Sequence, residues 1–243
     1  MIDPTLPLGF LGSFGGAVDF ILHERQAVLG GHMVGGPAQV WELTRAQLEV
    51  SGLALAGSII VALPAGVWLG HRRRGEFFAV ALGNAGRALP ELALVALLAA
   101  VIGVGLRNVS LALIVLGVPP ILTNSYVGIS QVDRDAVDAA RGIGMGELAI
   151  ILRIELPLAI PTIMSGVRTA AINIVATATI AAVVGFSTLG TFIIGRDVYG
   201  SDGVTAGAIC VAVLALIVEF ALAGVQRLLT PKGLRLQRAA ARA

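Results

Sequence analysis

The sequence predicts an all-α membrane protein that crosses the bilayer several times. Hydrophobic residues occupy 56% of its 243 positions, charged residues only 13%, and the mean hydropathy is +0.89. A soluble domain carries about 25% charged residues and would be hard to keep dispersed with the present composition. The charges also gather in short clusters between apolar runs of about twenty residues, the length that a helix needs to cross a bilayer.

Five apolar runs are expected to span the membrane. They are 50–70, 77–98, 108–129, 169–184 with a Gly-rich continuation at 185–190, and 203–226. In a five-span arrangement, the basic clusters at 71–74, in the 131–157 loop and after 226 all lie on one side. The positive-inside rule places that side in the cytoplasm. We therefore expect the N-terminus outside, the C-terminus inside, and an external polar loop at 196–202.

The N-terminal segment is expected to lie on or pack against the membrane without spanning it. Residues 6–22 are apolar but are interrupted by Gly, Pro and Asp, and no basic residue precedes Arg25, which argues against a signal peptide. The predicted organisation is an extracytoplasmic or interfacial segment at 1–40, a transmembrane domain at 41–229 with a cytoplasmic loop at 131–157, and a basic cytoplasmic tail at 230–243.

Catalysis by this chain is not expected. Its only Lys, Lys232, follows Thr230-Pro231, so the chain contains no GxxxxGK[ST] phosphate loop and ATP hydrolysis would belong to a partner. The three His lie in the first third of the chain, outside the long apolar runs, which argues against a Ser-His-Asp centre. The single Cys210 allows neither an intrachain disulfide nor a Cys-based zinc site. We expect no metal, no cofactor and no nucleic-acid-binding module.

A polar, charged stretch at 138–157 stands out in this apolar chain and predicts a short helix-turn-helix outside the bilayer. Two small residues would allow close helix contact and two glycines a sharp turn. These residues are Ala139, Ala140, Gly142 and Gly144. Pro157 is expected to stop the second helix, which begins near Gly146.

This stretch resembles the EAA signature of ABC-importer permeases, which reads Glu-Ala-Ala, three residues, Gly, nine residues, Ile, any residue, Leu-Pro. Six positions are in register: Ala139, Ala140, Gly144, Ile154, Leu156 and Pro157. Asp138 replaces the Glu, which keeps the charge and shortens its reach. Pro90-Glu91-Leu92-Ala93 is similar to a Pro-Xaa-Leu-Ala run of these permeases. The resemblance covers roughly 40–229 and implies the five-helix core of a type I importer permease.

The resemblance also implies partners. In similar importers the loop is a coupling helix through which ATP-driven closure of two ATPases switches the pore. The expected coupling residues are Asp138, Ala139, Ala140, Arg141, Gly142, Gly144, Met145, Gly146, Glu147, Leu148, Ile151 and Leu152. The last two, with Leu148, would form an apolar ridge on a helix at 146–153. ATP and Mg²⁺ would be bound by the ATPase subunits. A second permease chain, identical or related, and an extracytoplasmic binding protein would complete the assembly in a prokaryotic cell membrane.

Polar residues inside the predicted spans are candidates for the translocation path. They are Asn84, Arg87, Pro90, Glu91, Asn124, Asn173 and Thr177. Ionisable groups at this depth should face protein or water. Arg87 and Glu91 lie one helical turn apart, so they either line the path or satisfy one another as an internal pair.

Three shorter sequence motifs bear on which solute is transported. Asn124-Ser125-Tyr126, Val132-Asp133 and the run 156–161 look like the glycine betaine, choline and osmoprotectant branch. The alternatives are a methionine-type or other small-solute ABC permease, a secondary transporter and a membrane scaffold. A secondary transporter usually shows repeated halves, which we do not find, and a scaffold would not need the signature. Gly66 and Gly70 are interpreted as sites of tight packing within the chain.

Overall fold

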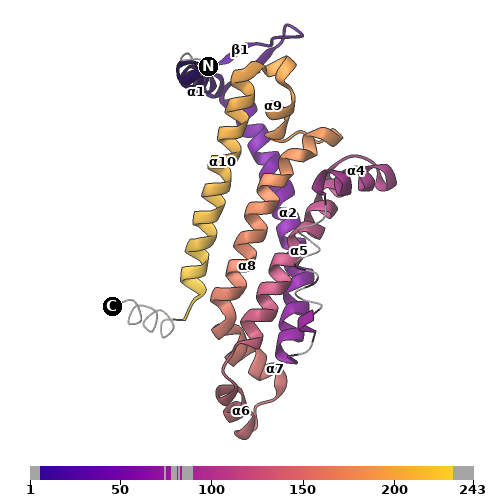
Figure 1. The fold of residues 1–243 in the computed structure, drawn as a ribbon, viewed down its shortest axis with the longest axis vertical. Helices are drawn as coiled ribbons and strands as arrows, with labels where there is room; N and C mark the ends of the chain where they lie inside the picture. The colour runs from indigo at the N-terminus through magenta and orange to yellow at the C-terminus, as the bar shows by residue number, and fades with distance from the viewer. Residues whose placement is uncertain (1–5, 74, 78–80, 82, 84–89, 232–243) are drawn as a thin grey trace. The chain divides into compact units, whose positions relative to one another are not determined.

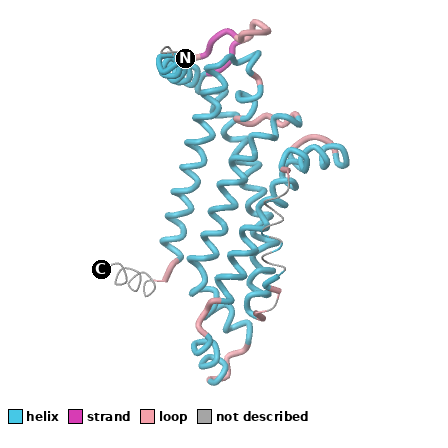
Figure 2. The backbone as a smooth tube through the Cα atoms, in the orientation of Figure 1, coloured by secondary structure: helices cyan, strands magenta, loops and turns pink. Residues whose placement is uncertain are grey.

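The computed structural model describes residues 6–73, 75–77, 81, 83 and 90–231. The chain divides into two compact units, which are described separately. Unit 1 comprises 1–53, 91–112 and 175–216, and unit 2 comprises 54–90, 113–174 and 217–243. Long helices contribute residues to both units, and the only strands among the described residues form one short hairpin (Figures 1 and 2).

The described elements confirm an all-α membrane architecture. The helices are α1 (Leu6–Leu22), α2 (Gly36–His71), α4 (Glu91–Ile102), α5 (Leu106–Ser130), α6 (Arg134–Gly142), α7 (Glu147–Ile150), a π-helical segment (Ile151–Glu155), α8 (Leu156–Thr177), a 3₁₀ segment (Ala178–Val184), α9 (Gly190–Ile194) and α10 (Arg196–Leu229). Strands β1 (Glu24–Gln26) and β2 (Met33–Gly35) pair antiparallel, with Glu24 opposite Gly35.

Four helical segments are long and apolar enough to cross a membrane. They are Gly36–His71, Leu106–Ser130, Glu147–Val184 and Arg196–Leu229. Each contains one of the predicted spans. The remaining predicted span, 77–98, falls largely outside the described residues, and its described end belongs to the short apolar helix α4.

Two predicted boundaries were wrong because polar residues do not by themselves end a helix. Helix α2 begins at Gly36, well before the predicted start at 50, and carries Glu42, Arg45 and Glu49 on its first turns. The predicted loop at 196–202 is helical and is interrupted only at Gly200, where φ is +69°. Strong helix formers such as Glu and Arg extend a helix beyond its apolar part at little cost.

The prediction that Pro157 stops a helix was also wrong. The chain stays helical from Glu147 to Val184, and Pro157 is the second residue of α8. The π-helical segment directly before it changes the hydrogen-bond spacing, so that the Leu156 N–H reaches the Ile151 carbonyl. Proline has no N–H group. In the first turn after such a segment, its missing N–H therefore costs no α-helical hydrogen bond. The spanning helix therefore starts well before the predicted residue 169.

Unit 2 is held together by close backbone approach of α2, α5 and α8. Its buried apolar cluster includes Ala62, Ile121, Ile129, Ile163 and Ala170. A Cβ added at Gly66 would lie 2.7 Å from the Leu122 carbonyl oxygen, and one at Gly70 would lie 2.8 Å from that of Tyr126. The interpretation of these two glycines as intrachain packing sites is confirmed.

Unit 1 gathers the hairpin, α1, α9 and the start of α10 around aromatic rings. Phe192 lies edge-on to Phe20 and Tyr199, with ring centroids 5.1 Å and 5.0 Å away. Arg25 of β1 stacks over Phe20 at 4.8 Å and forms an ion pair of 2.7 Å with Asp202 of α10. The hairpin is thereby fixed to α10, which lies far away in sequence.

An ion pair inside unit 2 joins two of the spanning helices. Arg168 of α8 contacts Glu219 of α10, and its Nη1 also donates to Gln226 Oε1 at 2.9 Å. The Gln226 amide in turn donates to the Pro161 carbonyl at 3.2 Å. Because the predicted span began at residue 169, sequence reasoning left Arg168 outside the membrane and did not recognise this pair.

Replacing Gly66 or Gly70 by Ala should push α2 away from α5 and destabilise the detergent-solubilised protein by about 1–3 kcal/mol, the usual cost of overpacking. The thermal midpoint measured by size-exclusion recovery after heating reports this loss. Gly52→Ala is the matched control on the same helix, because its added methyl group meets nothing within 4 Å. A thermal midpoint unchanged in both test variants would contradict the described packing.

Arg168→Leu or Glu219→Leu alone should lower the fraction of folded protein, since each change leaves the other, partly buried charge without its ion-pair partner at a cost of about 1–3 kcal/mol. The double variant should regain stability, because both charges are then gone. Arg196→Leu removes an exposed Arg and serves as the control. A double variant as unstable as the sum of the single ones would show that the two residues do not act as a pair.

Candidate functional site

The 131–157 loop folds as the predicted helix-turn-helix. The Asp133 carboxylate caps α6 by accepting from the Asp135 N–H at 3.0 Å. At the other end, the Ile143 and Gly144 N–H groups donate to the Ala139 and Arg141 carbonyls. Gly144 has φ +86°, a left-handed conformation that favours glycine, so the predicted turn is confirmed at this position. Helices α6 and α7 lie beyond the adjoining ends of α5 and α8 (Figure 1).

A small core of its own gives the loop a defined shape. Val132, Val137, Ala140 and Ile150 are buried together, with Met145 and Ile154 packed against them. Ala140 makes the close contact expected of a small residue, whereas Ala139 is exposed.

The exposed apolar surface of the loop differs from the predicted ridge. Leu148 and Leu152 are 68% and 54% exposed, as expected, but Ile151 is only 7% exposed and is not part of the surface. Ile151 follows the fully buried Ile150 and lies one turn before the buried Glu155, so it belongs to the inward face of this helix and not to the face of Leu148 and Leu152. Ile143, which is 80% exposed at the turn, belongs to the apolar surface instead. Its position between two glycines was the signal that sequence reasoning missed.

A chain of charged groups ties the loop to the end of α2. The His71 Nδ1 atom lies 2.7 Å from Glu155 Oε2, and its Nε2 atom lies 3.0 Å from Glu147 Oε2. Glu147 also accepts from Arg141, at 3.0 Å and 3.1 Å, and Arg141 lies 3.4 Å from Asp138. The side chains of His71 and Glu155 are only 7% and 3% exposed. Hydrogen bonding to Glu147 raises the pKa of the Arg141 guanidinium above its ordinary value, so this group stays charged.

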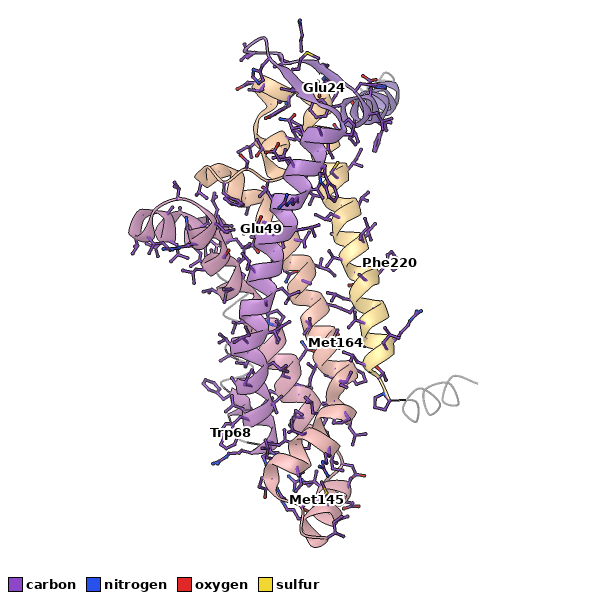
Figure 3. All side chains as sticks on the ribbon, turned by 180° about the vertical axis from the view of Figure 1, so that it is seen from behind. Glu24, Glu49, Trp68, Met145, Met164 and Phe220 are labelled. Carbon is purple, nitrogen blue, oxygen red and sulfur yellow. The ribbon has the colours of Figure 1, made fainter. Side chains whose placement is uncertain are left out.

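Arginines surround this network. A cavity of about 680 Å³ is lined by the network and by Trp68, Arg72, Arg73 and Arg134. The Arg72 guanidinium stacks over the Trp68 ring at 4.2 Å, and Arg73 donates to the Val132 carbonyl at 2.8 Å. Figure 3 shows Trp68 and Met145 near the same end of unit 2.

Sequence reasoning missed His71 and Glu155, although the sequence contained a signal. Glu155 stands between a polar loop and a long apolar run, where a carboxylate needs a partner. His71 stands at the end of another apolar run and can serve as that partner, but nothing in the sequence alone shows that the two junctions meet.

The predicted path residues are placed as follows. Asn84 and Arg87 lie outside the described residues, so the predicted Arg87–Glu91 pair is not addressed by the structure. In unit 1, the Thr177 hydroxyl donates to the Glu91 carboxylate at 2.8 Å. In unit 2, Asn124 donates to the Pro120 carbonyl of its own helix at 2.8 Å, and Asn173 is exposed. Pro90 is exposed.

Metal-binding geometry is not found in the described part of the chain, which contains no group of three His, Cys, Asp or Glu side chains placed to hold an ion.

The arrangement at the loop suits mechanical attachment to a partner: an exposed apolar surface on a rigid turn, tied through buried hydrogen bonds to a spanning helix.

A family model described as "binding-protein-dependent transport system inner membrane component" matches residues 62–232. This chain belongs to that family. The match contains the helix-turn-helix loop and the described parts of unit 2 from residue 62 onward. The chain is therefore a multi-pass membrane component of a transport system.

Relatives within this family are permeases. The glycine betaine/carnitine/choline transport system permease protein OpuCB of Bacillus subtilis is 38% identical over 193 residues, which are 79% of this chain and 89% of that protein. The carnitine transport permease protein OpuCB of Listeria monocytogenes is 35% identical over 198 residues, 81% of this chain and 89% of that one.

Solved structures confirm the predicted fold of the family. A permease chain of the inward-facing MetNI methionine ABC transporter matches with a TM-score of 0.68 and 19% identity, over 80% of this chain and 97% of that chain. The expected type I importer permease fold is therefore confirmed.

Gly144→Val should abolish most solute uptake by this permease without unfolding it, because a β-branched residue strains a left-handed turn by about 1–2 kcal/mol or more. Gly142→Val is the matched control: both added Cβ atoms meet nothing within 4 Å, but Gly142 is helical. Uptake normalised to membrane-inserted protein measures the effect. Equal uptake in the two variants would show that the backbone conformation at Gly144 is unimportant.

Proposed function

We propose that this chain is the transmembrane subunit of an ATP-driven importer for glycine betaine, choline, carnitine or a related quaternary amine. The observation that carries the proposal is the rigid helix-turn-helix loop with its exposed apolar surface, in a chain that belongs to a family of binding-protein-dependent transporters. The names of the relatives, at 35–38% identity, support the solute class.

The loop is the proposed receiver of mechanical work. We name the surface formed by Ile143, Leu148 and Leu152 the apolar docking surface; all three side chains are more than half exposed. An apolar groove on an ATPase subunit would cover it, and Arg141 and Glu147 at its edge would fix the orientation. Movement of the ATPase then shifts α7 and the spanning helix that continues from it.

The proposed assembly contains two ATPase subunits, a second permease chain and an extracytoplasmic binding protein. ATP and Mg²⁺ are bound by the ATPases, since this chain has no phosphate loop. The arginine-rich end with the loop faces the cytoplasm, and the β1–β2 hairpin faces outside. Solute selectivity rests mainly on the binding protein, because two Trp and two Tyr in this chain are too few and too dispersed for an aromatic cage.

The translocation path is proposed to run past the polar side chains of the spanning helices. In unit 1 the Glu91 carboxylate and the Thr177 hydroxyl meet at 2.8 Å, which joins α4 to the end of α8. A carboxylate in this position would favour passage of a cationic head group. Asn124 and Asn173 in unit 2 remain path candidates by polarity alone.

Leu148→Asp should reduce recovery of the ATPase with the affinity-purified permease by about tenfold or more, because a charge would have to enter an apolar groove. Leu29→Asp is the matched control, since Leu29 is 59% exposed in the hairpin of unit 1. Undiminished recovery of the ATPase with Leu148→Asp would show that the apolar docking surface does not bind the ATPase.

The solute class is tested by reconstituting the permease with its ATPase and binding protein in vesicles. Labelled glycine betaine, carnitine or choline should accumulate in the vesicles only when ATP is present. The permease alone should hydrolyse no ATP. ATP-driven accumulation of methionine instead of these amines would refute the proposed solute.

A further inference from the structure

The position of His71 suggests more than structural support for the loop. Its imidazole contacts carboxylates from two different helical segments, Glu147 at the start of α7 and Glu155 at the end of the π-helical segment. His71 itself is the last residue of α2. A single ring therefore joins three elements at the end of unit 2.

Both nitrogens of this ring face acceptors. Nδ1 lies 2.7 Å from a Glu155 oxygen and Nε2 lies 3.0 Å from a Glu147 oxygen. A neutral imidazole carries one N–H and would turn a lone pair toward one of the two carboxylates, whereas an imidazolium donates to both. Both contacts can be hydrogen bonds donated by the ring only when the ring is an imidazolium.

We propose that His71 is a positioning residue that transmits movement of the coupling loop to α2, and that it does so only in its protonated form. The proposal rests on the proposed function, because it assumes that an ATPase moves α7. When the ring is charged, α7, the start of α8 and the end of α2 move together. When it is neutral, α7 moves without α2, and ATP is hydrolysed without transport.

Histidine is the residue type lining this cavity whose ordinary pKa lies closest to neutral pH. Glu155 is buried and Glu147 is held by Arg141. The other charged groups that line the same cavity are Arg72, Arg73, Arg134, Asp138 and Arg141. The arginines keep their charge throughout the physiological range, and hydrogen bonding from Arg141 lowers the pKa of the Glu147 carboxyl below its ordinary value. The cavity of about 680 Å³ beside the ring also leaves space for a larger side chain.

The experiment measures solute transported per ATP hydrolysed, with the reconstituted complex in vesicles, across about pH 5.5 to 8 on the side of the ATPase, the range in which histidine titrates. In the wild type, this ratio should fall about tenfold toward high pH, as expected for loss of one charge-assisted hydrogen bond. His71→Gln should give a low ratio at every pH, while ATPase recovery stays normal.

Two variants separate transmission from mere stability. His71→Arg keeps a permanent charge and a fork of donors, so the ratio should remain high and independent of pH. Glu155→Gln replaces an acceptor by a group that can also donate, so the neutral ring regains its second hydrogen bond and the pH dependence should flatten. His32→Gln removes an exposed imidazole in unit 1 and should behave as the wild type.

Failure of this proposal can be distinguished from failure of the proposed function. If the complex assembles and transports, but the wild type and His71→Arg share the same pH profile, the role of His71 is refuted and the proposed function stands. If the wild-type complex transports no quaternary amine at any pH, the proposed function itself fails and this inference fails with it.

Discussion

Close backbone contact between α2 and α5 is the constraint on which unit 2 depends. Inside a bilayer, helices gain little from burying apolar side chains, so they associate through fitted surfaces and interhelical hydrogen bonds. Gly66 and Gly70 bring the two helices together because their missing side chains leave the Leu122 and Tyr126 carbonyls within contact distance. The Ser58 hydroxyl adds a hydrogen bond of 3.2 Å to the Ile114 carbonyl. The end of α2 is thereby held where His71 can reach the loop.

Electrostatics complements this packing. Two sets of paired charges lie in or beside the described spanning segments: Arg168 with Glu219, and His71 with Glu155 and Glu147. The first pair joins two long helices, and the second joins a long helix to a surface loop. Polar residues thus connect elements whose relative positions apolar packing alone would not fix. A protein that transmits movement from one helix to another requires such connections.

The sequence predicted much of the fold because its strongest signals are local. Apolar runs identify spanning helices, glycine spacing identified the close contact at Gly66 and Gly70, and the register of 138–157 identified the loop. The errors came from effects that composition does not show. Polar residues continued α2 and α10, a π-helical segment allowed the helix to pass Pro157, and Ile151 lies on the buried face beside Ile150. The network around His71 could not be predicted, because it depends on residues 84 positions apart meeting in space.

The central claim is that the turn at Ile143 touches an ATPase on the cytoplasmic side. Cysteine cross-linking tests it most directly, with Cys210→Ala as the background and one new cysteine at position 143 or, for comparison, at Leu29. The account predicts that a cysteine at 143 cross-links to the ATPase and is not labelled in intact cells by a thiol reagent that cannot cross the membrane, whereas a cysteine at 29 is labelled and forms no such cross-link. Labelling of position 143 from outside, or cross-linking of the ATPase to position 29 instead, would contradict it.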